Sequence, residues 1–177
     1  MTTQTLVASL VMAAVLALLS FLMIRAMLRG WLRRGERQAA LIGELPDVPE
    51  DPGPVTVEST SGLYVGSTLV PNWLDRVAVG DLGYRANAVL TRYTRGILME
   101  RSGATPLWIP ESSITAIRTE RGIAGKVVPR DGILAIRWRL PSGTEIDTGF
   151  RGDDRRKYAD FLRTRTRGAE KETRRSE

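Results

Sequence analysis

The chain has 177 residues, of which 26 are Lys or Arg and 20 are Asp or Glu, so that its net charge is +6. It contains neither cysteine nor histidine, which excludes disulfides, thiol nucleophiles, histidine-containing triads and the usual zinc sites. We therefore expect a protein that is not an enzyme and that has no catalytic residue, no cofactor and no metal site.

Residues 6–24 form an uncharged apolar run close to the N-terminus. Nineteen residues of helix rise about 28 Å, which nearly matches a hydrocarbon core of about 30 Å. Arginines follow this run on its C-terminal side, whereas residues 1–5 carry no charged side chain. Because basic residues stay on the cytoplasmic side, we expect a single-pass plasma-membrane protein with its N-terminus outside and its C-terminal domain in the cytoplasm. The alternative, a cleaved secretory signal, has its basic residues before a shorter apolar run.

The arginines after the apolar run recur at helical spacing. Four of them lie four residues apart, at positions 25, 29, 33 and 37, which places them along one slowly drifting face of a helix. We expect the anchor and its basic juxtamembrane helix to occupy residues 1–42, with a tryptophan at headgroup depth and guanidinium groups that reach lipid phosphates. The expected membrane-interface residues are Arg25, Arg29, Trp31, Arg33, Arg34 and Arg37.

Residues 43–54 break the helical pattern with four prolines and four acidic residues. Proline forbids a helix interior and favours an extended, semi-rigid spacer. The acidic side chains are repelled by an anionic bilayer. We expect this linker to act as a stalk that holds the following domain away from the membrane.

From residue 55 onward, short runs rich in Val, Ile, Thr, Tyr and Trp alternate with glycine and proline, a pattern typical of β-strands. A domain over residues 55–165 is expected, followed by a disordered charged tail over 166–177. The expected strands are 55–60, 63–69, 85–93, 96–101, 105–110, 114–120, 133–140 and 144–150.

The residue pattern of the last two strands predicts the register in which they pair. If Pro141, Ser142 and Gly143 form a three-residue hairpin loop with a positive φ at Gly143, apolar residues face apolar ones and basic residues face acidic ones. The inner pairs are Trp138 with Ile146 and Leu134 with Phe150, and the outer pairs are Arg137 with Asp147 and Arg139 with Glu145.

One soluble helix is expected after the last strand. Gly152 and Asp153 offer an N-cap, with Asp154 in the first turn, where a negative charge suits the helix dipole. Tyr158, Phe161 and Leu162 follow at helical spacing and form an apolar stripe. The predicted fold class is mainly β (α+β): a single transmembrane helix, then a bent antiparallel sheet or open barrel that is capped by a C-terminal helix.

This order of elements resembles bacterial pleckstrin-homology-like (PH-like) domain proteins, in particular small actinobacterial ones with a single N-terminal membrane span. The residues that carry the resemblance are Leu107-Trp108-Ile109-Pro110, Ile114 and Ile117, together with the helix from Asp153 to Leu162. The resemblance implies a partly open, seven-stranded barrel used for binding rather than catalysis. Phosphoinositide recognition is not implied, because residues 59–70 contain no Lys or Arg.

Two basic groups are the candidate partner or lipid contacts: Arg121, Lys126 and Arg130 on a glycine-rich loop, and Arg155, Arg156 and Lys157 on the terminal helix. The alternative interpretation is that both are ordinary solvated charges on a hairpin connection and on a helix face. The loop lacks the glycine and the Ser or Thr that a Walker A phosphate-binding loop requires.

The expected function is that of a membrane-anchored, non-catalytic adaptor whose cytoplasmic domain recruits a protein partner to the inner face of the plasma membrane. One alternative is a peripheral domain that responds to anionic phospholipid through the basic groups. Another is an accessory subunit of a transport or export complex, since small residues recur along the span (Ala8, Ser9, Ala13, Ala14, Ala17 and Ser20). Nucleic-acid binding is not expected of a domain tethered to a membrane.

Overall fold

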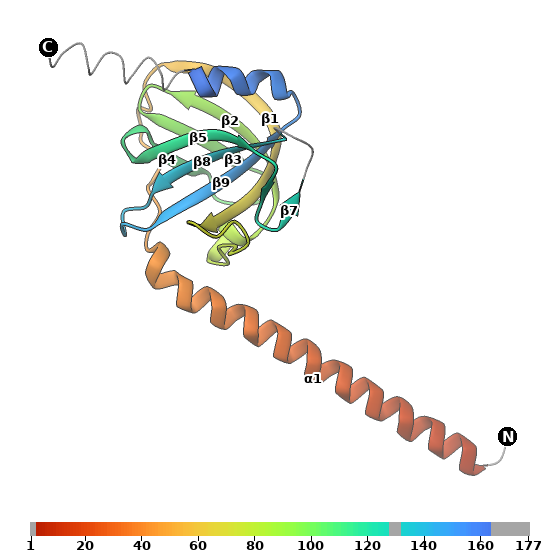
Figure 1. Cartoon of the computed structure of the whole chain (residues 1–177). Helices are drawn as coiled ribbons and strands as arrows, with labels where there is room; N and C mark the ends of the chain where they lie inside the picture. Colours follow the sequence, from red (N-terminus) through yellow and green to blue (C-terminus); the bar gives the residue numbers. More distant parts are fainter. Residues whose placement is uncertain (1–2, 128–131, 164–177) are drawn as a thin grey trace, which may run out of the picture.

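The computed structural model describes residues 3–127 and 132–163, apart from the side chains at positions 5, 6, 31, 32, 34, 35, 37, 126 and 127. The described chain consists of one long N-terminal helix, α1 (Thr3–Ile42), and a β domain that carries a short terminal helix (Figure 1). Arg130 and the predicted tail over 166–177 lie outside the described residues.

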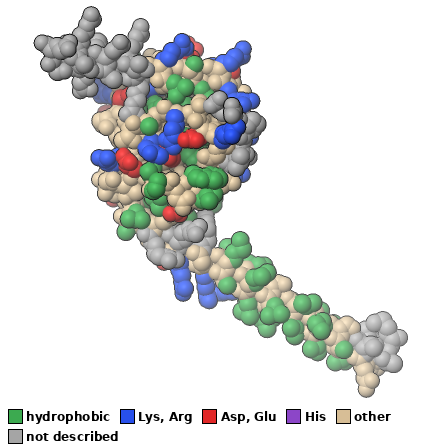
Figure 2. All heavy atoms as spheres, viewed as in Figure 1, with side chains coloured by type: hydrophobic (Ala, Val, Ile, Leu, Met, Phe, Trp, Pro, Cys, Tyr) green, Lys and Arg blue, Asp and Glu red, His purple; other side chains and the backbone are tan. Residues whose placement is uncertain are grey.

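Helix α1 contains a stretch from Val7 to Gly30 with a mean hydropathy of 2.7, long and apolar enough to cross a membrane. A signal sequence near an N-terminus can pass the same test of length and apolar composition. None of this stretch is buried within the protein, and its apolar side chains cover the part of the helix that projects from the domain (Figure 2). The helix ends where Gly43 takes a left-handed φ of +64° and donates its N–H to the Ala39 carbonyl (2.8 Å), a common C-terminal cap.

The domain is built on one antiparallel sheet of seven strands in the order β4-β3-β2-β1-β9-β8-β5. In the described residues β4 and β5 form the two edges, so the sheet is open and not closed into a barrel. A two-stranded hairpin, β6 (Gly122–Ile123) with β7 (Lys126–Val127), lies beside it. The strands of the large sheet are β1 (Val55–Leu69), β2 (Ala86–Tyr93), β3 (Gly96–Arg101), β4 (Leu107–Pro110), β5 (Ile114–Glu120), β8 (Ile133–Arg139) and β9 (Glu145–Gly152).

Strand β1 is a single strand where two had been expected, 55–60 and 63–69. The expected break covers Ser61 and Gly62, but Gly62 pairs with Ala88 of β2 on one side and with Gly152 of β9 on the other. A Cβ added at Gly62 would lie 2.4 Å from the Arg151 carbonyl oxygen. Gly62 therefore does not end the strand but permits a close approach of three strands, and β1 passes from one half of the sheet to the other there.

The predicted register of β8 and β9 is confirmed. Trp138 pairs with Ile146, Leu134 with Phe150, Arg137 with Asp147 and Arg139 with Glu145. Gly143 has a φ of +89°, and the Leu140 N–H donates to the Thr144 carbonyl (2.8 Å), as a three-residue loop requires. Trp138 and Phe150 are fully buried, so the inner face of these strands forms the centre of the core.

The short terminal helix covers the open side of the core with its apolar stripe, at the end of the domain opposite α1 (Figure 1). It begins as a turn, η3 (Arg155–Lys157), and continues as α-helix over 158–163. Tyr158 and Phe161 are buried, as their spacing predicted. The cap lies one residue later than expected, because the Asp154 carboxylate, not Asp153, accepts from the backbone N–H of Arg156.

The predicted stalk is wrong. The segment 43–54 lies along the domain, where Leu45 packs against the core and the Pro54 carbonyl accepts from the Thr94 N–H (3.0 Å). Asp51 pairs with Arg95 at 3.2 Å. Proline sets the extended conformation that the sequence indicates, but the segment binds the domain surface instead of spanning solvent. Helix α1 consequently ends directly at the sheet (Figure 1).

Candidate functional site

The basic cluster on the terminal helix is largely occupied by contacts within the chain. Arg156 pairs with Asp154 (3.0 Å), and the Lys157 ammonium donates to the Ser59 carbonyl (2.9 Å). Arg155 is exposed on the same turn. The cluster lies at the end of the domain that points away from α1 (Figure 1). Its role in binding remains a prediction.

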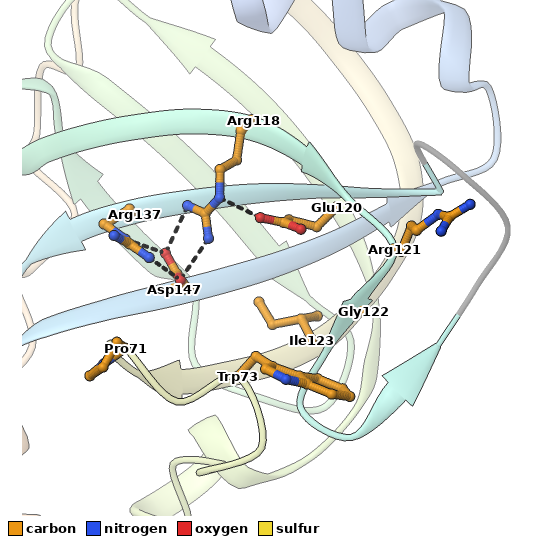
Figure 3. A pocket seen from close by; sticks show the side chains of 9 residues that line it. All are labelled: Pro71, Trp73, Arg118, Glu120, Arg121, Gly122, Ile123, Arg137 and Asp147. Carbon is orange, nitrogen blue, oxygen red and sulfur yellow. Dashed lines mark hydrogen bonds and ion pairs between the residues drawn. The ribbon is translucent and has the colours of Figure 1, made fainter.

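The second predicted group is described only in part. The Lys126 side chain and Arg130 lie outside the described residues, whereas Arg121 is exposed at the entrance to hairpin β6–β7. Arg121 belongs to the wall of a cleft of about 430 Å³. The cleft is lined by Pro71, Trp73, Arg118, Glu120, Arg121, Gly122, Ile123, Arg137 and Asp147 (Figure 3).

Three parts of the fold build this cleft. The outer face of β5, β8 and β9 supplies its charged floor, because the register sets Arg137 opposite Asp147 and Arg118 beside them on β5. Hairpin β6–β7 packs on the same face, with Ile123 so close to Gly149 that a Cβ at position 149 would lie 2.5 Å from its Cγ2. The loop after β1 forms the remaining wall, tied to the hairpin by a hydrogen bond from the Ala124 N–H to the Trp73 carbonyl (3.0 Å).

Asp147 fixes two guanidinium groups on the floor of the cleft. Arg118 donates to both of its carboxylate oxygens (3.1 and 2.8 Å), and so does Arg137 (3.0 and 2.9 Å). Arg118 also donates to Glu120. Burial favours a higher pKa for the Asp147 carboxyl, but the hydrogen bonds from Arg137 and Arg118 outweigh it and hold the pKa below its ordinary value. The same hydrogen bonds raise the pKa of both arginines.

The arrangement can bind an anionic group beside an apolar one. Three arginines against two carboxylates leave the cleft with a net charge of +1. The side chains of Arg118 and Arg137 are 32% and 31% exposed, and each guanidinium has five N–H donors, more than its carboxylate partners use. Trp73 is 44% exposed and adds a flat apolar surface. Figure 2 shows charged side chains at the centre of this face with apolar ones next to them.

The geometry does not suit proton transfer. A general base works best with a pKa close to neutral pH, whereas the pKa of Asp147 is lowered and its oxygens are held by two arginines. Among the described residues there is no group of three or more acidic side chains that could hold a metal ion.

Sequence reasoning missed most of this site. The sequence predicts the Arg137–Asp147 pair on the outer face of the hairpin, but it does not predict that Arg118 joins this pair. Arg118 gave a usable signal, because it follows the core-facing Ile117 and so points to the outer face of the same strand. Trp73 gave none, since nothing local shows which strands its loop folds against.

The predicted membrane-interface residues lie on the described backbone of α1. Arg25, Arg29 and Arg33 are exposed, and the Arg25 guanidinium lies 5.7 Å from the centre of the Phe21 ring. The side chains of Trp31, Arg34 and Arg37 lie outside the described part of the chain. Their contact with lipid remains a prediction.

Comparison with known sequences gives a family but no individual relative. The model of the family described as "Bacterial PH domain-like" matches residues 42–166. No curated protein matches the chain. The match begins at the last residue of α1 and covers the linker, the whole sheet and the terminal helix. PH-like domains are typically non-catalytic binding modules, in agreement with the character of the cleft. The chain belongs to the Bacterial PH domain-like family.

Proposed function

We propose that this chain is a membrane-anchored, non-catalytic adaptor that recruits a protein partner to the inner face of the plasma membrane. One observation carries the proposal: Asp147 holds Arg118 and Arg137 in fixed positions beside the exposed ring of Trp73. Tryptophan and arginine are the residue types that most often dominate the energy of protein interfaces. The partner segment that fits this cleft carries an acidic side chain next to an apolar one.

The N-terminal helix supports anchoring. Its apolar stretch ends at Gly30, and the helix continues without a break to Ile42. All arginines of the helix lie in its C-terminal half, which is nearer to the domain. This distribution favours a cytoplasmic domain by the positive-inside rule.

A protein partner is favoured over the membrane itself as the ligand of the basic groups. The cluster at 155–157 lies at the end of the domain away from α1, and two of its three charges are engaged within the chain (Figure 1). Exposed charges separated from a bilayer by more than a Debye length, about 8–10 Å, gain little from it.

The test is mild crosslinking of the full-length protein in its native membrane, with identification of what is recovered. We expect a stoichiometric protein partner whose yield falls about tenfold or more with Trp73→Ala or Arg118→Gln, because loss of an interface hot spot costs about 2 kcal/mol. Arg139→Gln is the matched control: it removes an exposed arginine on the outer face of β8 that does not line the cleft.

The other functions give different results. Recovery of lipid alone from the wild type would favour a lipid-responsive domain. Recovery of a transport protein in equal amounts from wild type and from both cleft variants would assign the association to α1 and overturn the adaptor proposal.

A further inference from the structure

Helix α1 is fixed to the domain by its last two turns. The Gln38 side chain is 6% exposed, and its amide donates to the Arg76 carbonyl (3.2 Å) while its oxygen accepts from the Ala78 N–H (2.8 Å). One turn later, Ile42 is fully buried in the core. On the other side, the Leu41 carbonyl accepts from two hydroxyl groups of the β8–β9 loop, Ser142 (2.6 Å) and Thr144 (2.7 Å). Contacts to two separate loops prevent the domain from rotating about the end of the helix.

This attachment sets the height of the domain above a bilayer. Gln38 directly follows Arg37, the last of the arginines that are expected to reach lipid phosphates. The headgroup region extends about 5–8 Å beyond the hydrocarbon on each side. The loop that Gln38 binds therefore lies at the level of the headgroups or just above them.

That loop carries exposed apolar side chains. Leu74 is 58% exposed and Trp73 is 44% exposed, and the next residue, Asp75, contacts the Gln38 amide at 3.4 Å. Figure 1 shows this part of the chain, after β1, at the end of the domain that faces α1. Large apolar side chains that water surrounds on a soluble surface are stabilised at a membrane interface, where tryptophan in particular accumulates.

We propose that the loop 71–74 rests in the headgroup layer of the bilayer that α1 crosses, with Leu74 as its deepest side chain. This inference rests on the membrane anchoring in the proposed function. Exposed Arg29 and Arg33 on the adjoining part of α1 add attraction for anionic headgroups on the same side. The loop also forms one wall of the cleft, so the cleft opens beside the membrane surface and a partner segment must enter it along that surface.

The absence of native cysteine makes a clean test available. The full-length variant Leu74→Cys, carrying an environment-sensitive fluorophore, is reconstituted into phosphatidylcholine vesicles with and without a lipid that bears a nitroxide on its headgroup. The matched control is Ala159→Cys, an exposed position on the terminal helix at the opposite end of the domain. We expect the nitroxide lipid to quench the fluorophore at position 74 several-fold more than the one at position 159. Adding Gln38→Ala to the Leu74→Cys chain should reduce this difference, because the attachment of α1 is weakened.

Equal quenching at the two positions, in protein that floats with the vesicles, would overturn the loop contact and leave the anchor standing. A chain that does not float with the vesicles would overturn the anchor and the loop contact together. A fluorophore at position 74 that is quenched equally with and without Gln38→Ala would overturn the orienting role of Gln38.

Discussion

Replacing Asp147 by Asn is expected to destabilise the domain by about 2–3 kcal/mol. Removing one partner of a buried ion pair costs about 3–5 kcal/mol. A smaller value is expected here because Arg118 and Arg137 are about one third exposed and water can solvate them in part. Asparagine keeps the shape but leaves the two guanidinium groups without a shared counter-ion, so the net charge of the cleft rises from +1 to +2.

The effect of Asp147→Asn on stability has a defined pH dependence. The pKa of Asp147 in the folded protein lies below its ordinary value of about 3.9. A carboxyl with a lowered folded pKa stabilises the protein fully above the unfolded pKa, and this contribution is lost as the pH falls through the folded pKa. The stability difference between the wild type and Asp147→Asn should therefore be constant above about pH 5 and shrink at lower pH.

Denaturant unfolding of the full-length protein in detergent, followed across pH, measures this difference. Glu145→Gln is the matched control, since Glu145 lies on the same face of β9 and pairs with the exposed Arg139 at 3.2 Å. An exposed pair of this kind contributes about 0–1 kcal/mol. Capture of the partner by folded Asp147→Asn separates two effects: weaker capture would show that the positions of Arg118 and Arg137 matter more than the added net charge, and stronger capture would show the reverse.

The fold was predictable where the residues that show a strand in the sequence also determine which residues it pairs with. In β8 and β9 the alternation of apolar and charged residues admits one register, and Gly143 supplies the loop conformation that this register needs. The residues from Leu107 to Pro110 indicated the family because they belong to the core of its fold. Trp108 and Ile109 are buried, and so is Ile114 on the next strand.

The errors came from features that tertiary contacts decide. Gly62 looks like a strand break in sequence, but it lies where β1 pairs with two strands at once. The prolines of 43–54 indicate an extended chain and cannot show that it lies against the domain, as the pairing of Asp51 with Arg95 shows. The cleft requires a loop residue, Trp73, to meet charged residues from three strands, and no local pattern encodes that meeting.

Replacing Arg101 by Met is expected to be the most destabilising of the changes considered, at about 3–5 kcal/mol. The Arg101 side chain is fully buried, donates to the Asp81 carboxylate (2.7 Å) and the Thr105 carbonyl (2.7 Å), and lies 4.9 Å from the centre of the Tyr64 ring. Asp81 belongs to the turn η1 (Gly80–Gly83), so the guanidinium connects β3 to the segment that leads from the α1 attachment into β2.

Methionine at position 101 fills much of the same volume but leaves the Asp81 carboxylate without its cation. Burial favours a higher pKa for Asp81, yet hydrogen bonds from Thr105 and Arg101 hold it below its ordinary value. The variant should lose part of that lowering, so its stability should fall less than that of the wild type as the pH drops below about 4. Arg139→Met is the control, because its single ion pair is 61% exposed on the arginine side and should change stability by about 0–1 kcal/mol. Equal unfolding midpoints for the two variants would show that burial of the Arg101 pair adds nothing to the attachment of this segment.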